Sequence, residues 1–207
     1  SDVTGATTVF YTPAVGGFVP IYDGTNFKMT AFSEVSQALS DSTKSPAATS
    51  ANNSYDWFVW SDSGTIRCTR GPAWSSSTSR GTGAGTTELV LTNGIYLNAN
   101  SITNGAAASR GTYVGTTRTD GSNQCNMIFG GGTGTAGGQS NRLDVWNAYN
   151  RVVAAANNFD NTNSWTYTTA TLRAKNNNAN NGVIFVVGLL GTPMEAANTV
   201  NVVQGNS

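Results

Sequence analysis

The feature that most constrains the fold is a repeated alternation of short apolar runs and turn residues. Runs rich in Val, Ile, Tyr, Phe, Trp and Thr recur along the chain, and clusters of Gly, Asn, Asp and Ser separate them. β-branched and aromatic residues favour strands, whereas Gly, Asn and Asp favour tight turns. The sequence therefore predicts an all-β protein, an antiparallel β-sandwich of jelly-roll type.

Roughly a dozen strands are expected from this pattern. They cover residues 9–12, 18–22, 27–30, 55–60, 65–70, 87–91, 95–98, 112–118, 124–129, 142–146, 151–155, 164–173 and 183–187. The pair Asp23–Gly24 predicts a hairpin turn, and Pro20 lacks an N–H and predicts a sheet edge. Because apolar strands need an opposing layer, we expect five side chains in the core: Trp57, Val59, Ile66, Ile184 and Val186.

One segment has helical rather than strand spacing. Phe32, Val35 and Leu39 stand at positions i, i+3 and i+7 with polar residues between them, which predicts one short helix near residues 31–39. A chain of 207 residues fits a single sandwich domain, so we expect one domain over residues 1–207. Residues 1–17 are expected to act as an attachment segment.

Charge is scarce and balanced. Eleven basic and eleven acidic residues make up 11% of the chain, and no segment concentrates Lys or Arg as a nucleic-acid binder would. We interpret the pairs Arg70–Gly71, Arg80–Gly81 and Arg110–Gly111 as turn entries. The longest apolar stretch, residues 182–190, is shorter than the ~20 residues that span a bilayer. We therefore expect neither a nucleic-acid partner nor membrane insertion.

Histidine is absent from the chain. This excludes Ser-His and Cys-His nucleophile pairs as well as every His-ligated metal site. Cys68 and Cys125 are too few for a zinc site. We interpret them as buried free thiols, with a single disulfide as the alternative, and expect no cofactor and no metal.

Carboxylates are the remaining candidates for catalysis. Five of them lie beside Gly, Ser, Thr or Asn and are interpreted as turn formers: Asp23, Asp41, Asp62, Asp120 and Asp160. Asp56 and Asp144 lie close to Trp57 and Trp146, and we interpret both as partly buried carboxylates that accept hydrogen bonds. A glycosidase pair is the alternative. Residues 160–164 resemble a calcium loop but lack its Gly and closing Glu, so we predict no catalytic residue and no enzyme.

Aromatic side chains allow a different function, because flat rings bind sugars. Trp74 lies in loop-like sequence and is the candidate for a glycan or partner contact, whereas the other four Trp residues lie in strand runs and are interpreted as core. Gly130–Gly138 and Asn176–Asn181 are expected to be outward-facing loops.

Six segments together resemble a known protein family. They are residues 19–26, 55–65, 70–74, 81–87, 110–115 and 146–151. They are similar to proteins encoded by tailed bacteriophages and prophages of Gram-negative bacteria, which are described as tail-fibre or head-decoration proteins. The resemblance extends from about residue 8 to residue 190. It implies a place on a virion and transfers no catalytic residue.

The resemblance implies a non-enzymatic structural protein on the virion exterior, assembled in the host cytoplasm. Its expected partners are further copies of itself, arranged as a trimer, other virion proteins and host surface polysaccharide. By analogy with phage fibres, docking is expected through the N-terminal side. The alternative function is a lectin-like carbohydrate-binding module.

Overall fold

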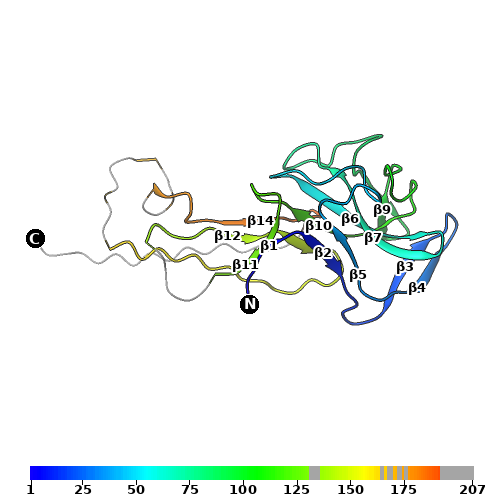
Figure 1. The fold of residues 1–207 in the computed structure, drawn as a ribbon, viewed down its shortest axis with the longest axis horizontal. Helices are drawn as coiled ribbons and strands as arrows, with labels where there is room; N and C mark the ends of the chain where they lie inside the picture. The colour runs from blue at the N-terminus through cyan, green and yellow to red at the C-terminus, as the bar shows by residue number, and fades with distance from the viewer. Residues whose placement is uncertain (131–135, 164–165, 167–169, 172–173, 175–176, 192–207) are drawn as a thin grey trace, which may run out of the picture.

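The chain forms antiparallel sheets stacked into a sandwich (Figure 1). The computed structural model describes residues 1–130, 136–163, 166, 170–171, 174 and 177–191. The strands are β1 (Val3–Ala6), β2 (Thr8–Tyr11), β3 (Phe18–Tyr22), β4 (Phe27–Ala31), β5 (Val35–Ala38), β6 (Ser54–Asp62), β7 (Thr65–Ala73), β8 (Leu89–Thr92), β9 (Ile95–Asn98), β10 (Thr112–Arg118), β11 (Cys125–Ile128), β12 (Asn141–Leu143), β13 (Val145–Asn147) and β14 (Val183–Phe185). The predicted all-β antiparallel sandwich is confirmed.

A large sheet forms the middle of the globular part, which we call the head. Its order is β7-β6-β10-β9-β8, and β13 pairs with β10. Seven successive residues of β6 are buried, because this strand is covered on both faces. That explains why the run Trp57–Trp60 is continuously apolar and aromatic instead of alternating. The predicted jelly-roll arrangement is not confirmed by this strand order.

One face of the large sheet is covered by the hairpin β3–β4 and the pair β2–β5. Val19 and Ile21 of β3 pack with Trp57, Val59 and Cys68 in one apolar cluster. Pro20 stands in a two-stranded sheet, where both strands are edges, as its missing N–H requires.

The other face of the large sheet has its own apolar cluster. Phe58 of β6 and Tyr113 of β10 pack there with Ile102, and partly buried side chains close the cluster from outside. Phe58 points opposite to Trp57 and Val59 because side chains alternate along a strand.

Most of the predicted core is confirmed. Trp57, Val59 and Val186 are 3%, 0% and 9% exposed, and Ile66 packs partly buried against the first cluster. The prediction for Ile184 was wrong, because this side chain is 42% exposed. It lies on β14, which is an edge strand of its sheet among the described residues.

The predicted helix at residues 31–39 was wrong. Ala31 ends β4, and residues 35–38 form β5, which pairs antiparallel with β2. Gln37 and Leu39 are buried, and Ser36 and Ala38 are exposed, which is the period of a strand. The buried side chain of Gln37 is polar because it binds Arg70, and this hid the strand period from a reading based on hydrophobicity.

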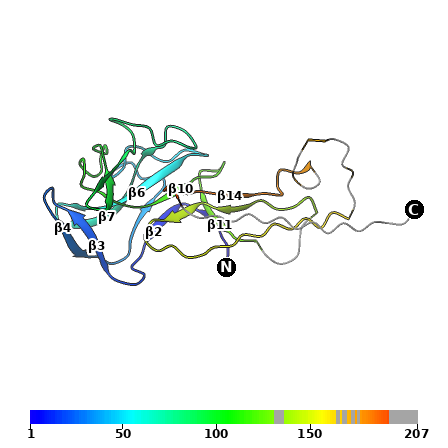
Figure 2. The ribbon, with the colours of Figure 1, turned by 180° about the vertical axis from the view of Figure 1, so that it is seen from behind.

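A narrow arm extends from one end of the head in both views (Figures 1 and 2). We define the arm as residues 136–143, 151–163 and 177–186. At its base the strand order is β1-β11-β12-β14, with β12 and β14 parallel. The strand predicted at 151–155 was wrong, because no strand forms there.

Several predicted segments are only partly described. Residues 131–135 of Gly130–Gly138, Asn176 of Asn176–Asn181 and most of 164–173 lie outside the described residues. Residues 3–6 and 8–11 of the expected attachment segment form β1 and β2, which pair with β11 and β5. Attachment through residues 1–17 stays a prediction.

Candidate functional site

Asp56 lies at the centre of a buried polar cluster on β6. Arg80 donates from Nε to Oδ2 over 2.7 Å and from Nη2 to Oδ1 over 3.1 Å. The hydroxyls of Thr87 and Thr116 donate to the same carboxylate over 2.9 and 2.7 Å. Burial raises the pKa of Asp56, and the charge and hydrogen bonds of Arg80 oppose that rise. Four donors occupy the carboxylate, so its role is to hold β6, β10 and the 80–87 loop together.

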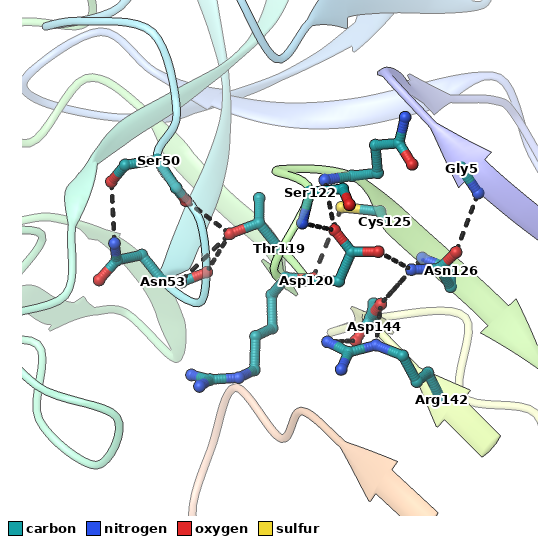
Figure 3. A network of polar contacts seen from close by, with 12 residues as sticks. Gly5, Ser50, Asn53, Thr119, Asp120, Ser122, Cys125, Asn126, Arg142 and Asp144 are labelled. Atoms are coloured by element: carbon teal, nitrogen blue, oxygen red, sulfur yellow. Dashed lines mark hydrogen bonds and ion pairs between the residues drawn. The ribbon is translucent and has the colours of Figure 1, made fainter. Parts of the chain in front are cut away.

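Asp144, between β12 and β13, is also fully buried and hydrogen-bonded (Figure 3). Its carboxylate accepts hydrogen bonds from Arg142 over 2.9 and 3.0 Å and from the backbone N–H of Asn126 over 2.9 Å. Asn126 also accepts from the Gly5 N–H and donates to Asp120. The network joins β1, β11 and β12. The interpretation of Asp56 and Asp144 as hydrogen-bond acceptors is confirmed.

The Asp residues interpreted as turn formers mostly have that role. Asp23 accepts from the N–H groups of Thr25 and Asn26, and Asp41, Asp120 and Asp160 bind N–H groups two residues onward. Asp62 instead forms ion pairs with Lys44 and Arg67. The Asp160 carboxylate also accepts from Gly137 and Asn181, so protein donors fill it.

The two cysteines are buried and unbridged, which confirms the interpretation as free thiols. Burial raises the pKa of Cys68 well above its usual value and that of Cys125 to about 12, so neither is a thiolate nucleophile at neutral pH. Among the described residues, no group of three or more Cys, Asp or Glu side chains could hold a metal ion. In the same residues, no helix has the length and apolarity needed to span a membrane.

Trp74 directly follows β7 and is half-buried. The Arg80 guanidinium lies over its ring, 4.4 Å from the ring centroid, and covers one ring face. The indole N–H is buried without a hydrogen-bond partner among the described residues. A sugar would therefore have only the other face for stacking, and a glycan contact at Trp74 stays a prediction.

The arm carries a surface that the sequence interpretation missed. Six large apolar side chains on it are between 36% and 102% exposed: Val152, Val153, Phe159, Val183, Ile184 and Phe185. Hydrophobic strand runs do predict burial, but they do not say whether the covering layer belongs to the same chain.

The chain matches no protein family model, no curated protein and no solved structure.

A groove of about 560 Å³ lies on the head between the β3–β4 hairpin and the β6–β7 hairpin. It is lined by Ile21, Tyr22, Asp23, Lys28, Thr30, Ser61, Gly64, Ile66 and Arg110. A smaller groove of about 400 Å³ lies near the base of the arm and is lined by Arg80, Glu88, Tyr96 and Arg151 among others.

The interpretation of Arg70–Gly71 as a turn entry was wrong, because both residues lie inside β7. The three Arg-Gly pairs also have different environments. Arg70 is fully buried and donates to Gln37 and to the carbonyls of Asp41 and Ala47. Arg80 pairs with Asp56, whereas Arg110 lines the larger groove. The sequence signal is the same for all three, so only the neighbours brought by the fold distinguish them.

Proposed function

We propose that the chain is a non-enzymatic structural subunit of a multi-copy assembly on the exterior of a tailed-phage particle. The observation that carries the proposal is the exposed apolar surface of the arm. Apolar side chains left in water favour association, with about 1.5–3 kcal/mol gained for each one that becomes fully buried. We infer that neighbouring subunits provide that burial.

The composition of the arm favours further copies of the same chain as the partner. Its charged residues are Arg142, Arg151 and Asp160 alone, and Arg142 pairs internally with Asp144. Identical copies present identical charges, so a nearly neutral surface meets little repulsion when it packs against itself. We propose a trimer.

Among the described residues, one edge of β14 is unpaired, which supports the same proposal. β14 stands last in the order β1-β11-β12-β14. An edge strand offers unpaired N–H and C=O groups to another chain. Lys or Pro residues often block such an edge, and the sequence Val183-Ile-Phe185 has neither.

The virion location rests on the sequence resemblance to phage tail-fibre and head-decoration proteins. The uncharged polar surface agrees with it, because the hydration of Asn, Ser and Thr side chains depends little on salt and pH. Antibodies raised against the head should label the outside of the intact particle. Labelling only of disrupted particles would contradict the exterior position.

Size-exclusion chromatography with light scattering tests the assembly. The full chain should run as a trimer, and the double substitution Val153→Asp with Ile184→Asp should give a monomer because charges would face each other between copies. Val15→Asp is the matched control, since Val15 is 100% exposed in the loop between β2 and β3. A full chain that stays monomeric at high concentration, or equal effects of both variants, would refute assembly through the arm.

A lectin-like module is the second candidate function. The observation that favours it is the larger groove on the head, which combines an aromatic ring, hydroxyls and an arginine. The two functions are compatible, because the groove and the arm are separate surfaces.

A further inference from the structure

Within the described residues, Arg110 is a cation without a counter-charge. It immediately precedes Gly111 and β10, and its guanidinium carbon lies 5.9 Å from the centroid of the Tyr22 ring. Its Nη1 is buried and has no hydrogen-bond partner in the described part of the chain, and the remainder of its side chain likewise has no ion pair there. Nε and Nη2 also have no hydrogen-bond partner there but are not buried, so this edge of the guanidinium is open to an acceptor in the groove.

The β3–β4 turn is shaped around this guanidinium. Gly24 has a φ of 104°, and a Cβ there would overlap the Arg110 guanidinium. Asp23 fixes the turn by accepting the N–H groups of Thr25 and Asn26, both over 2.9 Å. These bonds, together with Lys28, hold the pKa of Asp23 well below its usual value. Hydrogen bonds therefore fix the conformation of the turn, and the missing side chain of Gly24 lets the guanidinium lie close to the backbone.

The charge in the groove comes from Arg110. Its charged lining residues are Asp23, Lys28 and Arg110, which sum to +1 (−1 + 1 + 1). The Lys28 ammonium lies 3.0 Å from the Asp23 carboxylate and neutralises it. The groove is thus left with one positive charge, which suits a ligand that carries one anionic group.

The remaining lining matches a sugar ring. Ile21 and Ile66 offer apolar surface, and Thr30 and Ser61 carry hydroxyls. Tyr22 adds an aromatic ring that also contacts Arg110 and Phe27. Sugar rings present C–H faces that pack on such surfaces and hydroxyls that hydrogen-bond at their edges. A planar guanidinium binds a carboxylate with two parallel hydrogen bonds.

We propose that this groove binds a carboxylate-bearing saccharide, a hexuronate unit, with its carboxylate on Arg110 and its ring against Tyr22. The proposal adds ligand binding to the proposed assembly function. The site needs no second copy, because every lining residue belongs to one chain. β3 and β4 lie at the end of the molecule opposite to the arm (Figure 1). Heads held together by their arms would present several such grooves outward, and repeated weak contacts would add up to firm attachment.

Isothermal titration calorimetry with a tetragalacturonate probe tests the proposal. The chain should bind it, and Arg110→Gln should weaken the affinity at least tenfold. Arg110→Lys keeps the charge but loses the planar pair of donors, so it should give an intermediate loss. The matched control is Arg118→Gln, which removes the same charge at the opposite end of β10 and should bind like the unmodified chain.

Two further probes and one variant separate the alternatives. A neutral galactose tetramer and a tetra-aspartate peptide should both bind at least tenfold more weakly than tetragalacturonate. No binding of tetragalacturonate, equal binding of either probe, or an equal loss in Arg118→Gln would overturn the proposal. The Val153→Asp and Ile184→Asp chain should still bind the probe at each groove, so failure of arm assembly and failure of the groove are distinguishable.

Discussion

At the scale of single residues, buried polar groups join parts of the head that are distant in sequence. Arg70 of β7 donates to Gln37 of β5 and to the carbonyls of Asp41 and Ala47 in the following loop. Ser45 adds hydrogen bonds to Gln37 and to the Arg70 carbonyl. Polar groups inside a protein are stable only when they are paired, so each of these bonds fixes one specific arrangement of the chain.

Asp56→Asn tests the buried ion pair. The substitution leaves the Arg80 guanidinium without its counter-charge, and we expect a loss of about 3 kcal/mol in the free energy of unfolding. Urea denaturation measures it. Asp62→Asn is the control, because its ion pairs with Lys44 and Arg67 lie at the surface and contribute little. Equal stability of both variants would show that the Asp56 cluster does not hold the head together.

At the scale of elements, side-chain amides hold the segments of the arm beside each other. Asn158 donates to the carbonyls of Gln139, Asn180 and Gly182. Asp160 accepts from Gly137 and Asn181. Hydrogen bonds from Asn side chains therefore join these segments of the arm to one another.

Acid should loosen this arm. Hydrogen bonds from Thr162 and Asn181 hold the pKa of Asp160 well below its usual value, whereas an unfolded Asp titrates near ~3.9. The stabilisation is thus present above about pH 4 and is lost as the pH falls through the lower, folded pKa. NMR should show the amide signals of Gly137 and Thr162 shifting at a lower pH than the ~3.9 of an unfolded Asp. The variant Asp160→Asn should lack that transition, and an identical transition in it would assign the effect to another group.

At the scale of the whole molecule, a head covered on both faces of its central sheet contrasts with an arm that leaves apolar side chains exposed. β6 and β10 are buried nearly throughout. Local stability follows burial and backbone pairing. The head is therefore expected to be stable in one chain, and the arm to depend on its neighbours.

Hydrogen exchange followed by mass spectrometry tests this difference. Peptides from β6 and β10 should exchange slowest at every protein concentration. Peptides covering 151–163 should exchange fast in dilute solution and slowly at the concentration where the trimer forms, because contacts between copies would shield them. The Val153→Asp and Ile184→Asp chain should keep fast exchange there. Concentration-independent exchange of the arm would contradict its dependence on neighbouring copies.

The local sequence determined the class of the fold and most of its strands. The run at 112–118 became β10 with the same bounds, and Asp23–Gly24 became a hairpin turn. Such features depend on side-chain shape and backbone preference within a few residues. The free cysteines and the hydrogen-bonded Asp56 and Asp144 also followed from residue type.

Only the tertiary structure decided which apolar runs are covered and which polar residues are buried. Gln37 is buried because Arg70 of β7 donates a hydrogen bond to its side chain. The segment predicted to be a helix forms β5 instead. Ile184 is 42% exposed on β14, an edge strand among the described residues. Arg80 and Arg110 share one local sequence pattern, yet Arg80 pairs with Asp56 and Arg110 has no ion pair in the part of the chain that the structure describes. Burial and charge pairing depend on contacts between residues far apart in the chain, which local pattern does not encode.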